Sequence, residues 1–334
     1  MVSGQWSVVS GQWQWQVVTL AMNNCYGQRT TDHGPLTTDH IFPMAVYEHT
    51  YQPYAGKLTA ERARFLVIPR YAYQDVFRSR IFGTLFVVCF VPLLVQSTLI
   101  YLHHNTSALT ILNINAGELF SLDGTFFRIF ANIQEWFAFV LTVIVGPPLI
   151  SRDLANNALP LYLCRPFSRA EYVIGKMAVL VMLLSAMTWI PGLLMFVFQS
   201  FLDGTDWMLP NLWIAGAILV SNWSWIILLT LLSTAVSALL KWRLAASAAI
   251  FAFFTIPVPV AGMISGLFRT RWGLLFSPSF VMQRITESLF RSESVFVIAG
   301  QTLPVTAAWV VYALICAVCL LILMRRVRAY EVVK

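Results

Sequence analysis

The residues with the clearest potential for chemistry lie between positions 146 and 176, in the stretch GPPLISRDLANNALPLYLCRPFSRAEYVIGK. Ser151 can cap the start of a helix, and Asp153 places a negative charge in the first turn, where the helix dipole favours it. The pattern predicts a short helix over residues 152–159. Pro160 and Pro166 limit its continuation, because proline cannot donate the backbone hydrogen bond that a helix interior needs.

A corner of sequence Arg-Pro-Phe-Ser-Arg then leads into the next apolar segment. Residues 151–172 therefore form a compact, charged and rigid elbow. The alternative is an ordinary charged connection, since loops on the cytoplasmic side of a membrane are rich in arginine in any case.

Other groups suited to catalysis or metal binding are few. Ionisable residues lie in the connection before the second apolar segment or at its edge: Glu118, Asp123, Arg128 and Glu135. Two of these carboxylates could form an acid–base pair, and the alternative is solvated loop charge. His103 and His104 could bind a metal, but adjacent residues of a helix point in different directions and no third ligand is evident.

The chain has no Gly-x-x-x-x-Gly-Lys sequence for binding nucleotide phosphates. Gly175 and Lys176 lack the earlier glycine, which would fall where Ala170 stands. Any ATP must therefore be bound elsewhere.

Composition places these residues in a membrane protein. The 334 residues are 58% hydrophobic and 11% charged, whereas about a quarter of the residues of a soluble domain are charged. The net charge of +7 does not indicate nucleic acid, because most basic residues flank apolar segments, where they can meet lipid headgroups. The composition predicts an all-α integral membrane fold that contacts lipid.

Six segments are long and apolar enough to cross a bilayer. They cover about residues 81–102, 136–150, 173–198, 212–240, 244–267 and 303–324, with a short loop holding Asp203, Asp206 and Pro210 between the third and fourth. Basic residues concentrate before the first span, in the elbow, between the fourth and fifth spans and after the sixth. The positive-inside rule therefore places both termini in the cytoplasm.

The chain before the first span divides into two segments. In residues 1–43, Val2–Trp6 recurs at Val9–Trp13 and Thr30–His33 recurs at Thr37–His40, which marks a low-complexity repeat and suggests that translation starts at Met44. Residues 44–80 form a cytoplasmic or interfacial segment, followed by the six-span membrane domain over residues 81–334. Within residues 58–80, Pro69 should break or kink a short interfacial helix that bends into the first span. The alternative is a plain juxtamembrane anchor.

The elbow resembles the equivalent connection in permease subunits of type-two ATP-binding-cassette (ABC) transporters. The family pattern is Arg-Glu, Gly-Thr, a leucine-rich turn, Pro-Val-Ser-Arg and Gly-Lys. The matching positions here are Arg152-Asp153, then Leu159, Leu161 and Leu163, then Pro166-Phe167-Ser168-Arg169, and Gly175-Lys176. The sequence departs from the pattern at Asn157-Ala158, which replace Gly-Thr, at the additional Pro160 and at Asp153, which is shorter than glutamate. With the six spans, the resemblance covers most of residues 44–334.

The resemblance implies an ATP-driven transporter, an exporter, and the short loops without a cleavable signal suit the bacterial inner membrane. The elbow would be a short cytoplasmic coupling helix docked on a separate cassette ATPase subunit, which binds ATP and Mg²⁺, so this chain would be neither an enzyme nor a cofactor carrier. A second permease subunit, identical or related, would complete a dimer. The residues expected to couple to the ATPase are Arg152, Asp153, Asn157, Leu159, Arg165, Pro166, Arg169 and Lys176.

Two alternatives remain open at this point. In this family the outer segment before the last span often forms short re-entrant helices over the substrate path, and residues 268–302 could do the same or lie as a loop on the outer surface. The chain could also be a membrane enzyme acting on lipid or glycan through Glu118, Asp123, Glu135 and His103, provided that these groups converge, or a membrane scaffold without transport.

Overall fold

The computed structural model describes residues 4–9, 12–17, 67–105, 122–156, 169–240, 242–295, 297–298 and 301–326. The chain divides into two compact units, Met1–Lys57 and Leu58–Lys334. In the first unit, strands β1 (Gly4–Val9) and β2 (Gln12–Val17) pair antiparallel. The sequence patterns do not predict this hairpin, and the suggested start at Met44 lies outside the described residues.

The described residues of the second unit form α-helices, one 3₁₀ helix and an isolated bridge. Among them, six helical segments are long and apolar enough to cross a membrane: Phe82–His104, Gly124–Ser151, Ala170–Asp203, Thr205–Leu239, Arg243–Leu267 and Val305–Arg326. All six predicted spans are confirmed. The second span, predicted from about residue 136 and as extendable at its front end, begins at Gly124, because its apolar buried face continues back through Phe130 and Phe127.

Three spans consist of two helices each. They are α2 (Arg80–Val88) with α3 (Val91–His104), α7 (Arg169–Met187) with α8 (Trp189–Asp203), and α10 (Arg243–Thr255) with α11 (Pro257–Leu267). The second helix of each pair carries a proline in its first turn: Pro92, Pro191 and Pro257. Proline cannot donate a hydrogen bond to the preceding turn, so it is tolerated at such a restart.

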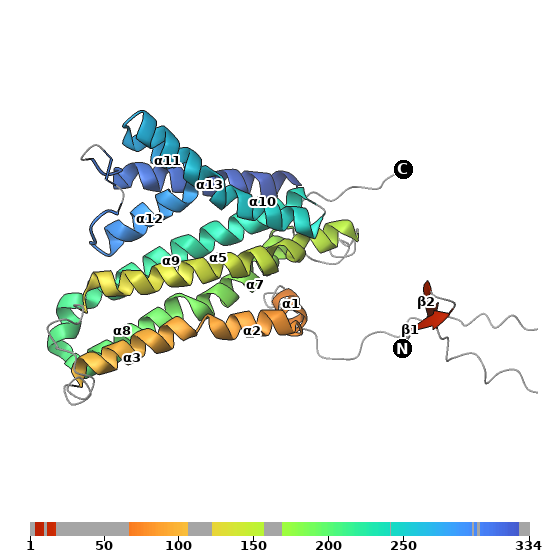
Figure 1. Ribbon diagram of the computed structural model, residues 1–334, viewed down its shortest axis with the longest axis horizontal. Coiled ribbons are helices and arrows are strands. Elements are labelled where there is room, and N and C mark those ends of the chain that lie inside the picture. Colours follow the sequence, from red (N-terminus) through yellow and green to blue (C-terminus); the bar gives the residue numbers. More distant parts are fainter. Residues whose placement is uncertain are drawn as a thin grey trace, which may run out of the picture. The chain divides into compact units, whose positions relative to one another are not determined.

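The remaining three spans are the continuous helices α5 (Gly124–Ala155), α9 (Thr205–Leu239) and α13 (Val305–Arg326). Figure 1 shows α5 and α9 side by side, with α2, α3, α7 and α8 on one side and α10 to α13 on the other. Apolar side chains of α9 such as Leu228, Leu229 and Leu232 are buried at the centre. Peripheral helices instead expose large apolar side chains such as Leu94 and Leu314, as lipid-facing surfaces do.

A short helix leads into the first span, as predicted. Helix α1 (Val67–Phe77) is followed by a turn at Arg78 and Ser79, where the Ser79 hydroxyl caps α2. Pro69 lies in the first turn of α1, where the missing N–H breaks no helical bond, so the expectation that it breaks or kinks the helix is wrong. The Tyr73 hydroxyl donates to the carbonyl of Val179, 2.9 Å away, and holds α1 against α7.

The turn between the third and fourth spans is shorter than predicted. Helix α8 ends at Asp203 and α9 begins at Thr205, so Gly204 alone separates them. Its φ of 79° favours glycine. Asp206 and Pro210 lie inside α9 rather than in a loop, and Pro210 is close enough to the start for the helix to tolerate it.

The segment before the last span contains the 3₁₀ helix η3 (Arg271–Phe276) and helix α12 (Pro278–Leu289). Val281, Met282 and Ile285 of α12 are buried in the main hydrophobic core. The surface-loop alternative is therefore wrong, because these residues form short helices packed into the bundle. Their position over a substrate path remains a prediction.

Candidate functional site

The first part of the elbow is the continuation of the second span. Helix α5 runs through Pro147 and Pro148 to Ala155, so residues 152–155 end a long helix and do not start a separate one. Ser151 is not a helix cap, since its hydroxyl donates to the carbonyl of Pro147, one turn earlier, at 2.6 Å. The predicted boundary failed because two prolines within a helix usually end it.

Neighbouring helices explain why α5 continues. Pro147 leaves the carbonyl of Val143 without its helical partner, and the Ser247 hydroxyl of α10 donates to that carbonyl at 3.0 Å. The Ser237 hydroxyl of α9 lies 3.3 Å from the carbonyl of Gly146. The Ser247 hydroxyl thus replaces the backbone hydrogen bond lost at Pro147, as polar groups do in other membrane helices with internal proline.

Asp153 joins the end of α5 to the start of α7. Its carboxylate oxygen Oδ2 lies 2.8 Å from Lys176 Nζ and accepts a 2.7 Å hydrogen bond from the Tyr172 hydroxyl. The Lys176 ammonium lies 5.7 Å from the centre of the Tyr172 ring. Both charged side chains are largely buried, so the pair is stronger than a surface salt bridge and holds the two helices together.

The structure describes only part of the predicted coupling set. Asp153 and Lys176 come together, as stated, although the sequence does not predict that they pair. Arg152 lies near the end of α5 and Arg169 begins α7, but the structure does not describe their side chains. The other coupling residues lie outside the described residues: Asn157, Leu159, Arg165 and Pro166.

The outer residues considered for catalysis or metal binding do not form one site where they are described. His104 Nε2 lies 2.7 Å from Asp203 Oδ1 and links α3 to α8. Asp123 is exposed, and its carboxylate accepts from the backbone N–H groups of Thr125 and Phe126 at the start of α5. Twelve residues of helix, about 18 Å, separate Asp123 from Glu135. Glu118 lies outside the described residues, within which no cluster of three possible metal ligands occurs.

Glu135 is the functional candidate whose environment the sequence interpretation missed. It lies inside the second span, about 17 Å along α5 from Gly124, and is 9% exposed. The solvated-loop alternative is therefore wrong for Glu135. The sequence feature that indicates its burial is the run of apolar residues on both sides of it, including Phe130 and Phe139. Burying an ionisable residue at such depth costs free energy, so residues of this kind usually mark functional sites in membrane proteins.

Glu135 lines a cavity of about 550 Å³ among α5, α9, α10, α11 and α12. Its Oε1 accepts a 3.2 Å hydrogen bond from the Thr286 hydroxyl of α12, and its backbone carbonyl accepts from Trp225 Nε1 at 3.0 Å. The cavity lies beside the break between α10 and α11, where Thr255 and Val258 line it. Much of the remaining lining is aromatic, including Phe139 and Phe254.

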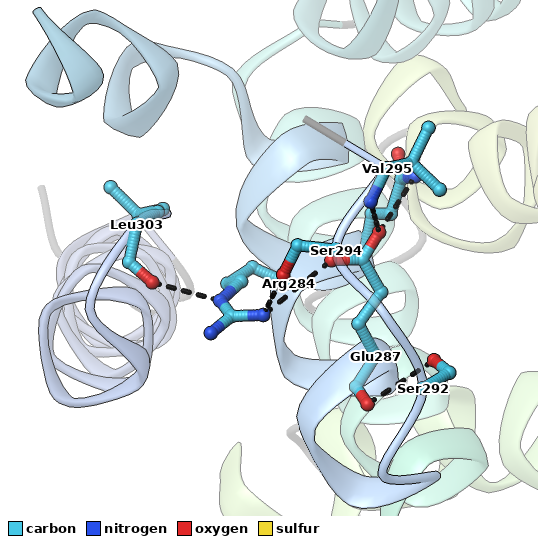
Figure 2. A network of polar contacts seen from close by, with 7 residues as sticks. Arg284, Glu287, Ser292, Ser294, Val295 and Leu303 are labelled. Carbon is cyan, nitrogen blue, oxygen red and sulfur yellow. Dashed lines mark hydrogen bonds and ion pairs between the residues drawn. The ribbon is translucent and has the colours of Figure 1, made fainter. Parts of the chain in front are cut away.

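A second buried carboxylate, Glu287, belongs to a structural network (Figure 2). Its Oε1 accepts from Gln283 Nε2 at 3.1 Å and from the backbone N–H of Val295 at 3.2 Å. Arg284 Nη1 lies 3.7 Å from Glu287 Oε2, while Arg284 Nε donates to the carbonyl of Leu303 at 2.8 Å. This network fastens α12 to the segment that enters α13.

The six apolar spans and the helical core define the chain as an all-α, multi-pass membrane protein. No known family model matches it, and no curated protein matches it either.

Proposed function

We propose that this protein is the permease subunit of an ATP-driven export transporter of the bacterial inner membrane. A separate cassette ATPase would bind ATP and Mg²⁺ and dock on the elbow, and a second permease subunit would complete the translocation path. This chain would perform no catalysis of its own.

The observation that carries the proposal is the buried contact of Asp153 with Lys176 and Tyr172. A partner that pushes on the elbow must move something within the membrane, and this contact ties together the two helices that leave it. Since α5 continues without interruption from the elbow into the second span, a displacement there would be transmitted along a rigid helix.

In the proposed mechanism, closure of two ATPases moves the elbows and tilts α5 and α7 together. Packed helices switch between discrete arrangements rather than deforming continuously, so a small displacement at the elbow can open a path elsewhere. Arg152, Arg165 and Arg169 would contribute positive charge to the docking surface.

The test is co-purification of the full chain from membranes with a cassette ATPase encoded beside its gene. The informative variant is Arg165→Glu/Arg169→Glu, which reverses two charges in the elbow. The matched control is Arg325→Glu/Arg326→Glu, which reverses two charges at the end of α13. We expect a complex with the wild type and the control, and at least a tenfold loss of bound ATPase with the elbow variant.

Equal complex formation by both variants would show that the ATPase does not dock on these arginines. No complex with well-folded wild-type protein would remove the main support for the proposal.

Lys176→Met separates coupling from docking, because Lys176 ties the helices inside the elbow. The complex should persist, with the stimulation of ATP hydrolysis by the permease reduced several-fold. Lys176→Arg, which keeps the charge beside Asp153, should retain most of that stimulation. Unchanged stimulation in Lys176→Met would exclude the ion pair from coupling.

A further inference from the structure

The cavity beside Glu135 has features of a binding site that elbow coupling does not use. It encloses about 550 Å³, enough for a small organic molecule. Glu135 lies within the Gly124–Ser151 span, so the cavity is at the depth of the hydrocarbon core. A ligand would therefore have to be apolar enough to reach it.

The carboxylate is poorly satisfied within the described residues. Thr286 supplies one hydrogen bond to Oε1, and no described residue donates to Oε2 or forms an ion pair with Glu135. By contrast, Glu287 has Arg284, Gln283 and a backbone N–H. An ionised carboxylate in apolar surroundings is costly unless a cation accompanies it, and no described residue supplies one at Glu135.

The rest of the lining suits a cation with an apolar body. Trp136, Phe139, Trp225 and Phe254 present aromatic rings, and aromatic faces attract cations. The side chains of Asn132 and Gln283 add amide groups at the wall. Among the described residues no basic side chain lines the cavity, and the nearby Arg284 is engaged by Leu303, Ser294 and Glu287, so this lining offers an anion no positive partner.

We propose that this cavity binds an amphipathic organic ammonium ion. The ammonium group donates to Glu135 Oε2, and the apolar body lies against the aromatic side chains. Trp225 and Thr286 hold the glutamate in place through its carbonyl and its Oε1. This assignment does not depend on an ATPase partner.

The test measures binding of rhodamine 6G, a fluorescent cation with ethylamino groups, to the full chain in phosphatidylcholine nanodiscs. Fluorescence anisotropy is compared with that in empty nanodiscs. We expect saturable binding to the wild type and at least a tenfold higher Kd for Glu135→Gln, which keeps the size of the side chain. Asp123→Asn removes an equal charge directly before the same helix and outside the cavity, and should leave the Kd unchanged.

Two further measurements separate recognition of the cation from loss of folding or simple apolar binding. Thr255→Trp should abolish binding by filling the cavity while Glu135 stays intact, since Thr255 is an exposed residue of the lining. As a competitor, 1-aminoadamantane should displace the dye at least tenfold better than the neutral 1-adamantanol, which has the same cage.

Wild-type affinity in Glu135→Gln would overturn the proposal. So would equal displacement by the two adamantanes, which would assign the cavity to neutral lipid chains, and so would the absence of saturable binding to the wild type. The assay contains neither ATP nor an ATPase, so a negative result leaves the proposed transport function standing.

Discussion

Gly146→Ala should destabilise the contact between the two central helices near the elbow. A Cβ atom at position 146 would lie 1.8 Å from Ser233 Oγ and 3.0 Å from Ser233 Cβ of α9. Rotation of the serine hydroxyl can relieve the first contact but not the second. The helices must therefore separate by a few tenths of an ångström, and overpacking of this kind costs about 1–3 kcal/mol.

Helix propensity acts in the opposite direction, because alanine is favoured over glycine by about 0.5–1 kcal/mol inside a helix. Gly216→Ala provides the matched control: Gly216 lies inside α9, and a Cβ there meets nothing within 4 Å. Gly216→Ala should stabilise the protein slightly. The free energies of unfolding of the two variants should then differ by the packing cost alone, about 1–3 kcal/mol.

The assay is reversible unfolding in mixed micelles by SDS titration, followed by circular dichroism. A double variant, Gly146→Ala/Ser233→Ala, should recover much of the loss. Ser233 Oγ is buried without a hydrogen-bond partner among the described residues, so its removal alone should cost little. If Gly146→Ala proves as stable as Gly216→Ala, α5 and α9 are not in the close contact described here, and the reasoning fails.

Two other predictions follow from buried polar contacts. Arg284→Gln should cost about 2–4 kcal/mol of unfolding free energy, because Glu287, 3% exposed, loses its cation, and Arg284→Gln/Glu287→Gln should recover most of this in the same SDS titration. If the double variant is no more stable than the single one, the charge pairing is unimportant. Burial raises the pKa of Tyr73 in α1 to about 12 from the usual value near 10. A raised pKa contributes stability below pH 10 that is lost as the pH rises through 12, so the unfolding free energy of the wild type should fall over this interval more steeply than that of Tyr73→Phe. Parallel pH profiles would contradict the burial of this hydroxyl.

The positions of the spans were largely predictable because bilayer thickness imposes a length and a composition on each one. The predicted helix ends were wrong where local proline and charge patterns indicated a boundary but the helix continues. Pro147 and Pro148 indicate a helix end, yet α5 continues because Ser247 of α10 supplies a hydrogen bond that no local pattern reveals. Asp206 and Pro210 indicate a loop, yet they belong to the first turns of α9.

In the candidate sites, too, local sequence features were predictable, whereas contacts between helices were not. Charge and proline spacing identified the elbow with Asp153, and the family resemblance pointed to Lys176. The ion pair of these two residues and the hydrogen bond from the Tyr172 hydroxyl required the packing of α5 on α7. The apolar residues on both sides of Glu135 indicated that it is buried. Its contacts with Trp225 and Thr286 were not predictable, because these residues lie far away along the chain.

Composition and local spacing were enough to predict a membrane protein of six helical spans with a charged elbow after the second, because each helix must satisfy its own backbone hydrogen bonds in lipid. The continuation of α5 through two prolines, the pairing of Asp153 with Lys176 and the cavity at Glu135 follow from the packing of the helices. The physical reason is that hydroxyl donors, counter-ions and cavity walls come from helices distant in sequence, and only their packing brings them together.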